Sequence, residues 1–166
     1  IKNNETEKAL DYINSAQKGI DLLSPKQYCK NNSTNLILSY YGSLAQKSGI
    51  RFDTKVNIPE VLTLSDTELC TLLSNGIENA INAASRCEKE NRWVEIDFST
   101  HKSNMLISIK NSYTGEVEIE DGLPVSDRPF HGLGVKSISS IAARHNGMYS
   151  FDAKDGQFTM RVILSL

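Results

Sequence analysis

The sequence lacks several features that would assign it to a specialised class of protein. No apolar run approaches the roughly 18 residues of a membrane-spanning helix, so we expect no direct membrane contact. Lysine and arginine are scattered and the net charge is −2, so the basic face that binds nucleic acid is absent. The three cysteines show no C-x-x-C spacing, which favours a reducing, cytoplasmic setting over a disulfide framework.

The composition that remains is that of an ordinary globular domain. The chain has 166 residues, of which 39% are hydrophobic and 23% are charged. Such a chain can form one well-packed core with an additional segment. The sequence begins at Ile1 without a methionine or a signal-like segment, and we therefore expect it to be a piece of a longer protein.

The first 24 residues predict a helix with a narrow apolar seam. Its apolar residues recur at alternating spacings of four and three over residues 5–23. The seam consists of Ala9, Ile13, Ala16, Ile20 and Leu23. This pattern is typical of a coiled coil or dimeric bundle, although a helix packed on its own domain can show it too. We expect residues 1–24 to be part of a dimerisation helix, and Ser24-Pro25 to mark its boundary with a domain over residues 25–166.

The remaining sequence predicts an α+β domain. Helices are expected over residues 33–47, 65–89 and 133–145. Alternating residues predict strands over 51–58, 93–100, 105–112, 148–153 and 158–166. The segment 114–131 carries acidic residues, Gly122 and two prolines with little periodicity, so we expect a mobile loop. Most strands form hairpins, which predicts a mixed, mostly antiparallel sheet with helices on one face.

Two of the expected helices carry local signals. The apolar face of the helix over 33–47 is expected to consist of Leu36, Ile37, Tyr40, Tyr41 and Leu44. The helix over 65–89 begins with a capping box, in which Ser65 and Glu68 satisfy free backbone donors of the first turn.

Three asparagines lie within the apolar helix over 65–89. Asn75 and Asn79 are one turn apart, about 40° around the helix axis, and Asn82 lies beside them. The side expected to pack on the sheet consists of Leu69, Leu72, Leu73, Ile77, Ala80, Ile81 and Ala84. Asparagine is a middling helix former, but its neutral carbonyl oxygen is a hard ligand suited to Mg²⁺ shared with phosphates. From this helix alone, a magnesium site and an ordinary solvent-facing edge are equally good interpretations.

A glycine loop, His131-Gly132-Leu133-Gly134-Val135, leads directly into the next helix. Its glycines let the backbone approach a phosphate, and the free N–H groups at the helix start favour an anion. The histidines show no spacing with cysteine or carboxylate residues that would predict zinc, and structural roles are favoured for His101, His131 and His145. The loop and the asparagine helix together predict a site for Mg·ATP.

These motifs resemble those of the GHKL superfamily, which includes gyrase-type ATPases, heat-shock-protein-90 chaperones and histidine kinases. Residues 72–80 are similar to the N box, residues 132–135 to the second glycine box, and residues 158–162 to the closing strand. The resemblance covers about residues 26–166 and is closest to peptide quorum-sensing sensor kinases of the accessory-gene-regulator type. It implies a two-layer α/β sandwich, the Bergerat-type ATP-binding fold.

The resemblance also implies roles for individual residues. Asn79 would ligate Mg²⁺, and Asn75 would help to hold the ion or a phosphate. The implied nucleotide site further includes Asn82, His131, Gly132, Leu133, Gly134 and Val135. Asn111 stands where most of the superfamily has an aspartate that accepts the adenine amino proton, and a neutral acceptor is roughly half as strong as a charged one.

By this resemblance the chain is the catalytic domain of a two-component sensor histidine kinase. The seam helix contains no histidine, so the phosphoacceptor is expected upstream of Ile1. The implied partners are ATP, a response regulator and a second copy bound through the seam helix, in the cytoplasmic part of a membrane-bound bacterial sensor. Two alternatives stay open: a pseudokinase scaffold with weak nucleotide binding, and a serine kinase of the anti-sigma-factor type.

Overall fold

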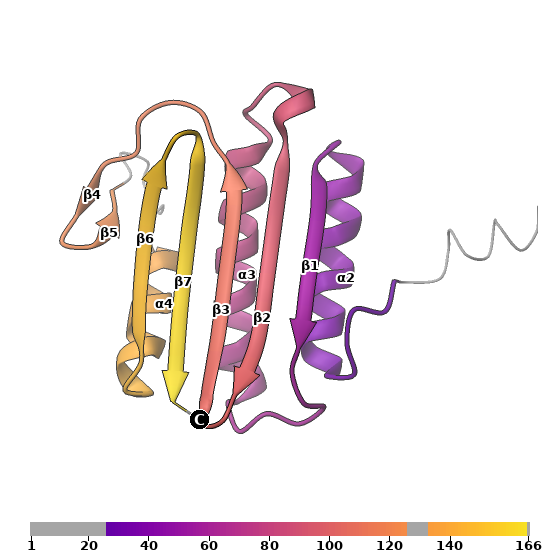
Figure 1. Cartoon of the computed structure of the whole chain (residues 1–166), viewed down its shortest axis with the longest axis vertical. Helices are drawn as coiled ribbons and strands as arrows, with labels where there is room; N and C mark the ends of the chain where they lie inside the picture. Colours follow the sequence, from indigo (N-terminus) through magenta and orange to yellow (C-terminus); the bar gives the residue numbers. More distant parts are fainter. Residues whose placement is uncertain (1–25, 126–132, 166) are drawn as a thin grey trace, which may run out of the picture.

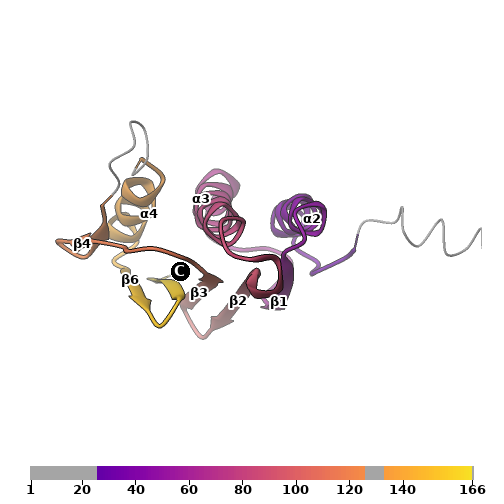
Figure 2. The same ribbon diagram turned by 90° about the horizontal axis from the view of Figure 1, so that it is seen from above.

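The computed structural model describes residues 26–125 and 133–165, which form one layer of helices on one layer of strands (Figure 1, Figure 2). The helices are α2 (Asn32–Lys47), α3 (Asp66–Ala84) and α4 (Leu133–Arg144). The main strands are β1 (Arg51–Asn57), β2 (Trp93–His101), β3 (Asn104–Ser112), β6 (Met148–Lys154) and β7 (Gln157–Ser165). The predicted α+β class is confirmed. The expected dimerisation helix lies outside the described residues.

The five main strands form one mixed sheet in the order β1-β2-β3-β7-β6. β1 runs parallel to β2, and the other neighbours are antiparallel. The register aligns Ile96, Ile109, Met160 and Phe151 in a row across the sheet, and all four are buried. The opposite face is mostly polar apart from Leu106, Ile163 and Met148, which pair in one row near an end of the sheet. One face of the sheet is therefore the one that the helices cover, as Figure 2 shows.

Helix α3 packs on the centre of the sheet. All seven apolar residues that the sequence assigns to its sheet-facing side are buried. A Cβ at Gly76 would lie 2.7 Å from Cδ1 of Ile109 and 2.8 Å from Cε of Met160. Such distances are well below an ordinary carbon–carbon contact. A side chain at position 76 would therefore have to push the side-chain ends of Ile109 and Met160 aside.

Helix α2 buries only part of the face that the sequence predicts. Ile37 and Tyr41 are buried as expected, whereas Leu36 and Tyr40 are 72% and 64% exposed and Leu44 is exposed as well, so the prediction is wrong for these three. The buried residues are Thr34, Ile37, Leu38, Tyr41 and Ala45. Two neighbouring faces of this helix are apolar, and the one with the smaller residues Thr34 and Ala45 lies against the sheet. Counting apolar residues cannot distinguish two such faces.

Two segment predictions also need correction. Helix α3 ends at Ala84 rather than near residue 89, and a short 3₁₀ turn follows at Lys89–Asn91. The guanidinium of Arg92 donates to the carbonyl of Cys87 at 2.9 Å, which holds the chain in this turn. The expected loop over 114–131 contains a hairpin, β4 (Ile119–Glu120) and β5 (Leu123–Pro124). Its turn, Asp121-Gly122, has positive φ at both residues, a signal that the sequence already carried.

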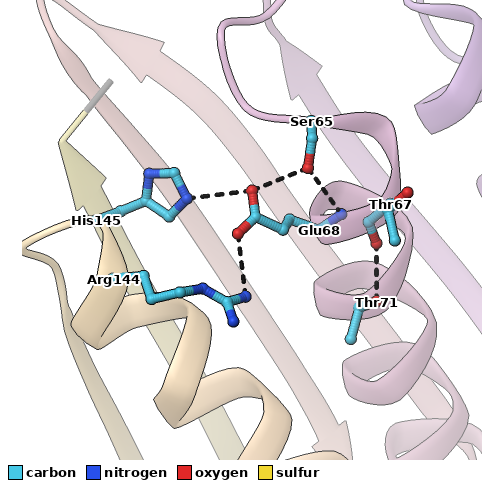
Figure 3. Close-up of polar contacts among 6 residues, drawn as sticks. All are labelled: Ser65, Thr67, Glu68, Thr71, Arg144 and His145. Atoms are coloured by element: carbon cyan, nitrogen blue, oxygen red, sulfur yellow. Dashed lines mark hydrogen bonds and ion pairs between the residues drawn. The ribbon is translucent and has the colours of Figure 1, made fainter.

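The first turn of α3 is joined to the end of α4 through Glu68 (Figure 3). Ser65 accepts a hydrogen bond from the Glu68 backbone N–H, as the capping box predicts, and its hydroxyl donates to Oε2 of Glu68 at 2.9 Å. Arg144 donates to Oε1 at 3.0 Å, and Nε2 of His145 lies 3.2 Å from Oε2. The bond from Ser65, followed by His145 and Arg144, holds the pKa of Glu68 below its ordinary value.

This pKa shift predicts how Glu68→Gln affects stability. Because the folded-state pKa is depressed, the carboxylate stabilises the fold above its unfolded pKa, near about 4.3. That contribution is lost as the pH falls through the lower folded value. We expect Glu68→Gln to lower Tm by about 2–4 °C at pH 7 and by progressively less below pH ~4.3, measured by circular dichroism.

Asp66→Asn is the matched control, because Asp66 lies in the same helical turn but bonds to Ser33 of α2. It should lower Tm by less than Glu68→Gln does at neutral pH. A Glu68→Gln effect that stays the same from neutral to acidic pH would contradict the role assigned to the ionised carboxylate.

Candidate functional site

A cavity of about 180 Å³ lies between α3, the sheet and the β4–β5 hairpin. It is lined from α3 by Gly76, Asn79, Ala80 and Ala83, and from α4 by Val135. The sheet contributes Ile109, Asn111, Phe151, Phe158 and Met160, and the segment after β3 contributes Tyr113, Val117, Pro124 and Val125. The lining is mostly apolar with two amide side chains, which is typical of a small-molecule site. A larger polar hollow of about 660 Å³ near Arg86 and Trp93 contains none of the predicted site residues.

The structure brings several of the predicted site residues to this cavity. Asn79, Asn111 and Val135 come from α3, β3 and α4 and all line it. Asn79 is exposed at the rim, whereas Asn75 is half-buried one turn earlier. These two asparagines therefore lie at the edge of the buried face of α3, as the sequence pattern predicts.

Other predicted residues are not brought into the cavity. Asn82 is exposed on α3, and Leu133 is 60% exposed at the start of α4; neither lines the cavity. His131 and Gly132 lie outside the described residues. The predicted site is thus split between a cavity, an exposed edge of α3 and the beginning of α4.

Asn111 is the most buried polar group of the site, at 1% exposure. Its Nδ2 donates to the backbone carbonyl of Ser112 at 2.9 Å. Because the amide nitrogen is used in this way, the carbonyl oxygen is the part of the side chain that can accept a hydrogen bond from a ligand. An exocyclic amino group of a heteroaromatic ring is a donor of the matching kind.

Asn75 joins α3 to the first turn of α4. Its Nδ2 lies 3.5 Å from the carbonyl oxygen of Gly134, which is a long and weak hydrogen bond. A Cβ at Gly134 would lie 3.2 Å from both Cγ and Oδ1 of Asn75, tighter than an ordinary contact. The absence of a side chain at Gly134 lets the two helices approach here. The start of a helix also favours bound anions.

The apolar walls come from residues that the sequence analysis did not assign to the site. Phe151 and Phe158 belong to the last hairpin, and their ring centroids are 6.2 Å apart. Val117 and Val125 flank the β4–β5 hairpin. Alternation in the last hairpin places both phenylalanines on the helix-covered face, but only the tertiary arrangement brings them beside Asn111. The cavity combines apolar walls with two neutral amide side chains, Asn79 and Asn111, and lies beside the start of α4.

Comparisons with known proteins identify the domain family and the fold. A sequence model of the GHKL domain matches residues 64–165. The nucleotide-free catalytic domain of the histidine kinase ThkA aligns with a TM-score of 0.64 at 17% identity, over 81% of this chain and 90% of that chain. No curated protein matches the sequence.

Two further solved kinases align in the same way. The Acinetobacter baumannii histidine kinase AdeS has a TM-score of 0.58 at 15% identity, over 80% of this chain and 62% of that chain. Full-length ShkA in complex with AMPPNP has a TM-score of 0.59 at 15% identity, over 84% of this chain and 30% of that chain. At these identities, the structural matches show a shared fold.

The contact between Gly134 and Asn75 leads to a test of the site. Gly134→Ala places a Cβ against Asn75, so Asn75 or the first turn of α4 must shift by a few tenths of an ångström. We expect ATP affinity to fall at least about tenfold, equivalent to about 1.4 kcal/mol, as measured by calorimetry. The free energy of unfolding should change little. The cost of this shift is offset by the higher helix propensity of alanine, which exceeds that of glycine by about 1 kcal/mol.

The control for this test is Ser140→Ala, an exposed substitution on the same helix. It should leave ATP affinity unchanged. Wild-type affinity in Gly134→Ala would show that the close approach to Asn75 does not matter for binding.

Proposed function

Because the chain belongs to the GHKL domain family, we propose that it is the catalytic domain of a two-component sensor histidine kinase. It binds Mg·ATP and transfers the γ-phosphoryl group to a histidine. The observation that carries the proposal is the convergence of Asn79, Asn111 and Val135 on one cavity beside the first turn of α4. The kinase folds that align with this chain are consistent with it.

The residues of the cavity fit an adenine nucleotide. The apolar walls accept a flat base, and the oxygen of Asn111 accepts a hydrogen bond from the amino group of that base. The phosphates lie toward the start of α4, where Gly134 leaves room for the backbone to approach and the helix start favours anions. His131, Gly132 and Leu133 belong to the same phosphate end in this proposal, and Asn82 to its outer edge.

Asn79 and Asn75 hold the metal end of the nucleotide. Neutral carbonyl oxygens are suitable ligands for Mg²⁺ that is also shared with phosphates and water. In this proposal Asn79 ligates the ion, and Asn75 holds the ion or a phosphate against the first turn of α4. Bound Mg²⁺ supplies charge neutralisation at the phosphates, on which phosphoryl transfer depends together with positioning.

Transfer to a histidine is favoured over hydrolysis. The hydrolases of the superfamily carry a glutamate at the position that matches Asn75, and asparagine cannot accept a proton at neutral pH. A neutral histidine is itself a nucleophile and needs no such base. The acceptor belongs to a helix upstream of Ile1, and residues 1–24 pair with a second copy in a homodimer.

The wider setting follows from the same resemblance. Asn111 in place of an acid, within Ile109–Gly115, is a feature of the peptide quorum-sensing subgroup, and a response regulator would receive the phosphoryl group. The domain would lie on the cytoplasmic side of a membrane-bound bacterial sensor. Within residues 26–125 and 133–165 no helix is long and apolar enough to cross a membrane.

Calorimetric titration with a non-hydrolysable ATP analogue tests the binding proposal. We expect a Kd between micromolar and sub-millimolar with Mg²⁺, and weaker binding without the metal. Asn79→Ala should weaken binding about tenfold, and only in the presence of Mg²⁺, because it removes a metal ligand. Asn57→Ala, an exposed asparagine on β1, is the matched control. Binding weaker than millimolar would favour the pseudokinase scaffold instead.

Incubation with γ-labelled ATP tests the transfer proposal. The chain itself should acquire no acid-labile label, because the acceptor histidine lies upstream. Strong labelling of His101, His131 or His145 would contradict this placement of the acceptor. Acid-stable transfer to a serine would favour the anti-sigma-factor type of kinase.

A further inference from the structure

Glu68 connects α3 and α4 at the opposite end of α4 from Gly134 (Figure 3). Its two carboxylate oxygens receive Arg144 at 3.0 Å and His145 at 3.2 Å, and Ser65 bonds to it from its own helix at 2.9 Å. The side chains of Glu68 and His145 are only 22% and 27% exposed. The pair of Glu68 with His145 is therefore partly shielded from solvent, whereas Arg144 is 58% exposed and its ion pair with Glu68 is screened like an ordinary surface pair.

The charges also match the ends of the two helices. Glu68 lies in the first turn of α3, where a negative charge is favoured, and Arg144 lies in the last turn of α4, where a positive charge is favoured. Each group is thus stabilised by its own helix before it contacts the other. The network is a fixed junction between the two helices.

Apolar packing alone defines the axis of α4 less well than apolar packing together with directed hydrogen bonds. Val135, Ile138, Ile141 and Ala142 bury one face of the helix. Hydrophobic burial is non-directional, so it holds α4 on the sheet without fixing small tilts. Directed bonds to Glu68 restrict those tilts at one end, and the weak contact between Asn75 and Gly134 adds little at the other.

We propose that Glu68 is a positioning residue, which fixes the axis of α4 through Arg144 and His145 and thereby sets the distance between Gly134 and Asn75. Ten residues separate Gly134 from Arg144, about 15 Å along the helix. A tilt of about 4° at the Glu68 junction therefore moves the first turn by roughly 1 Å. A movement of this size changes the 3.5 Å separation between Nδ2 of Asn75 and the carbonyl oxygen of Gly134, which is already at the long limit of a hydrogen bond.

The effect on nucleotide binding rests on the proposed function, whereas the placement of α4 does not. The experiment therefore first records the backbone amide signal of Gly134 by NMR in the nucleotide-free protein, and then measures ATP affinity by calorimetry. The variants are Glu68→Gln, Arg144→Gln and the double variant. Asp66→Asn is the control, since it removes a carboxylate of the same turn that bonds to α2 instead.

We expect the Gly134 signal to shift in Glu68→Gln and in Arg144→Gln, with no further shift in the double variant, because the two residues act through one junction. Asp66→Asn should leave the signal in place, and Arg144→Lys, which keeps the charge, should largely restore it. ATP affinity should fall about three- to tenfold in both single variants, about 0.6–1.4 kcal/mol, and remain unchanged in Asp66→Asn.

An unchanged Gly134 signal in folded Glu68→Gln, or independent and additive shifts in the double variant, would overturn the proposal. If Glu68→Gln does not fold, Arg144→Gln and His145→Gln remove the junction from the α4 side and decide the same question. If the wild-type protein binds no ATP, the proposed function fails, while the Gly134 signal still decides whether Glu68 positions α4.

Discussion

The close packing of α3 on the sheet is the constraint on which the rest of this structure depends. A Cβ at Gly76 would press on the side-chain ends of Ile109 and Met160, so the missing side chain lets α3 pack closely on β3 and β7 without displacing them. The same helix brings Asn79 to the cavity that Asn111 and Val135 also line. A larger residue at position 76 would push the ends of Ile109 and Met160 aside and narrow the cavity, since all three residues line it.

Much of this architecture was predictable from periodicity. The apolar stripe of α3, the two long hairpins and the helix after the glycine loop follow from spacings of 3.6 and 2, and the structure agrees. The buried face of α2 followed only in part, because Leu36 and Leu38 are equally apolar and only tertiary packing separates them. The link from Glu68 to Arg144 spans 76 residues, and no local pattern predicts a contact of that kind.

The polar residues of the candidate site could be predicted from the sequence, whereas the apolar residues that line the cavity could not. Asparagines within an apolar helix and glycines before a helix are unusual enough to be noticed in a sequence. In the sequence, Phe151 and Phe158 cannot be distinguished from other apolar residues of a hairpin. Only the order of the strands in the sheet brings them to the cavity that Asn111 lines. Because kinases at 15–17% identity share the fold alone, the functional argument depends on these particular side chains rather than on architecture.

The amide side chain of Asn111 also lowers the desolvation penalty of burying a polar group at this position. A carboxylate buried as deeply as this residue, at 1% exposure, would lose its hydration and would need a partner to compensate for it. A neutral amide whose nitrogen already bonds to the carbonyl of Ser112 has a much smaller desolvation penalty. The fold therefore does not depend on a counter-charge at this position.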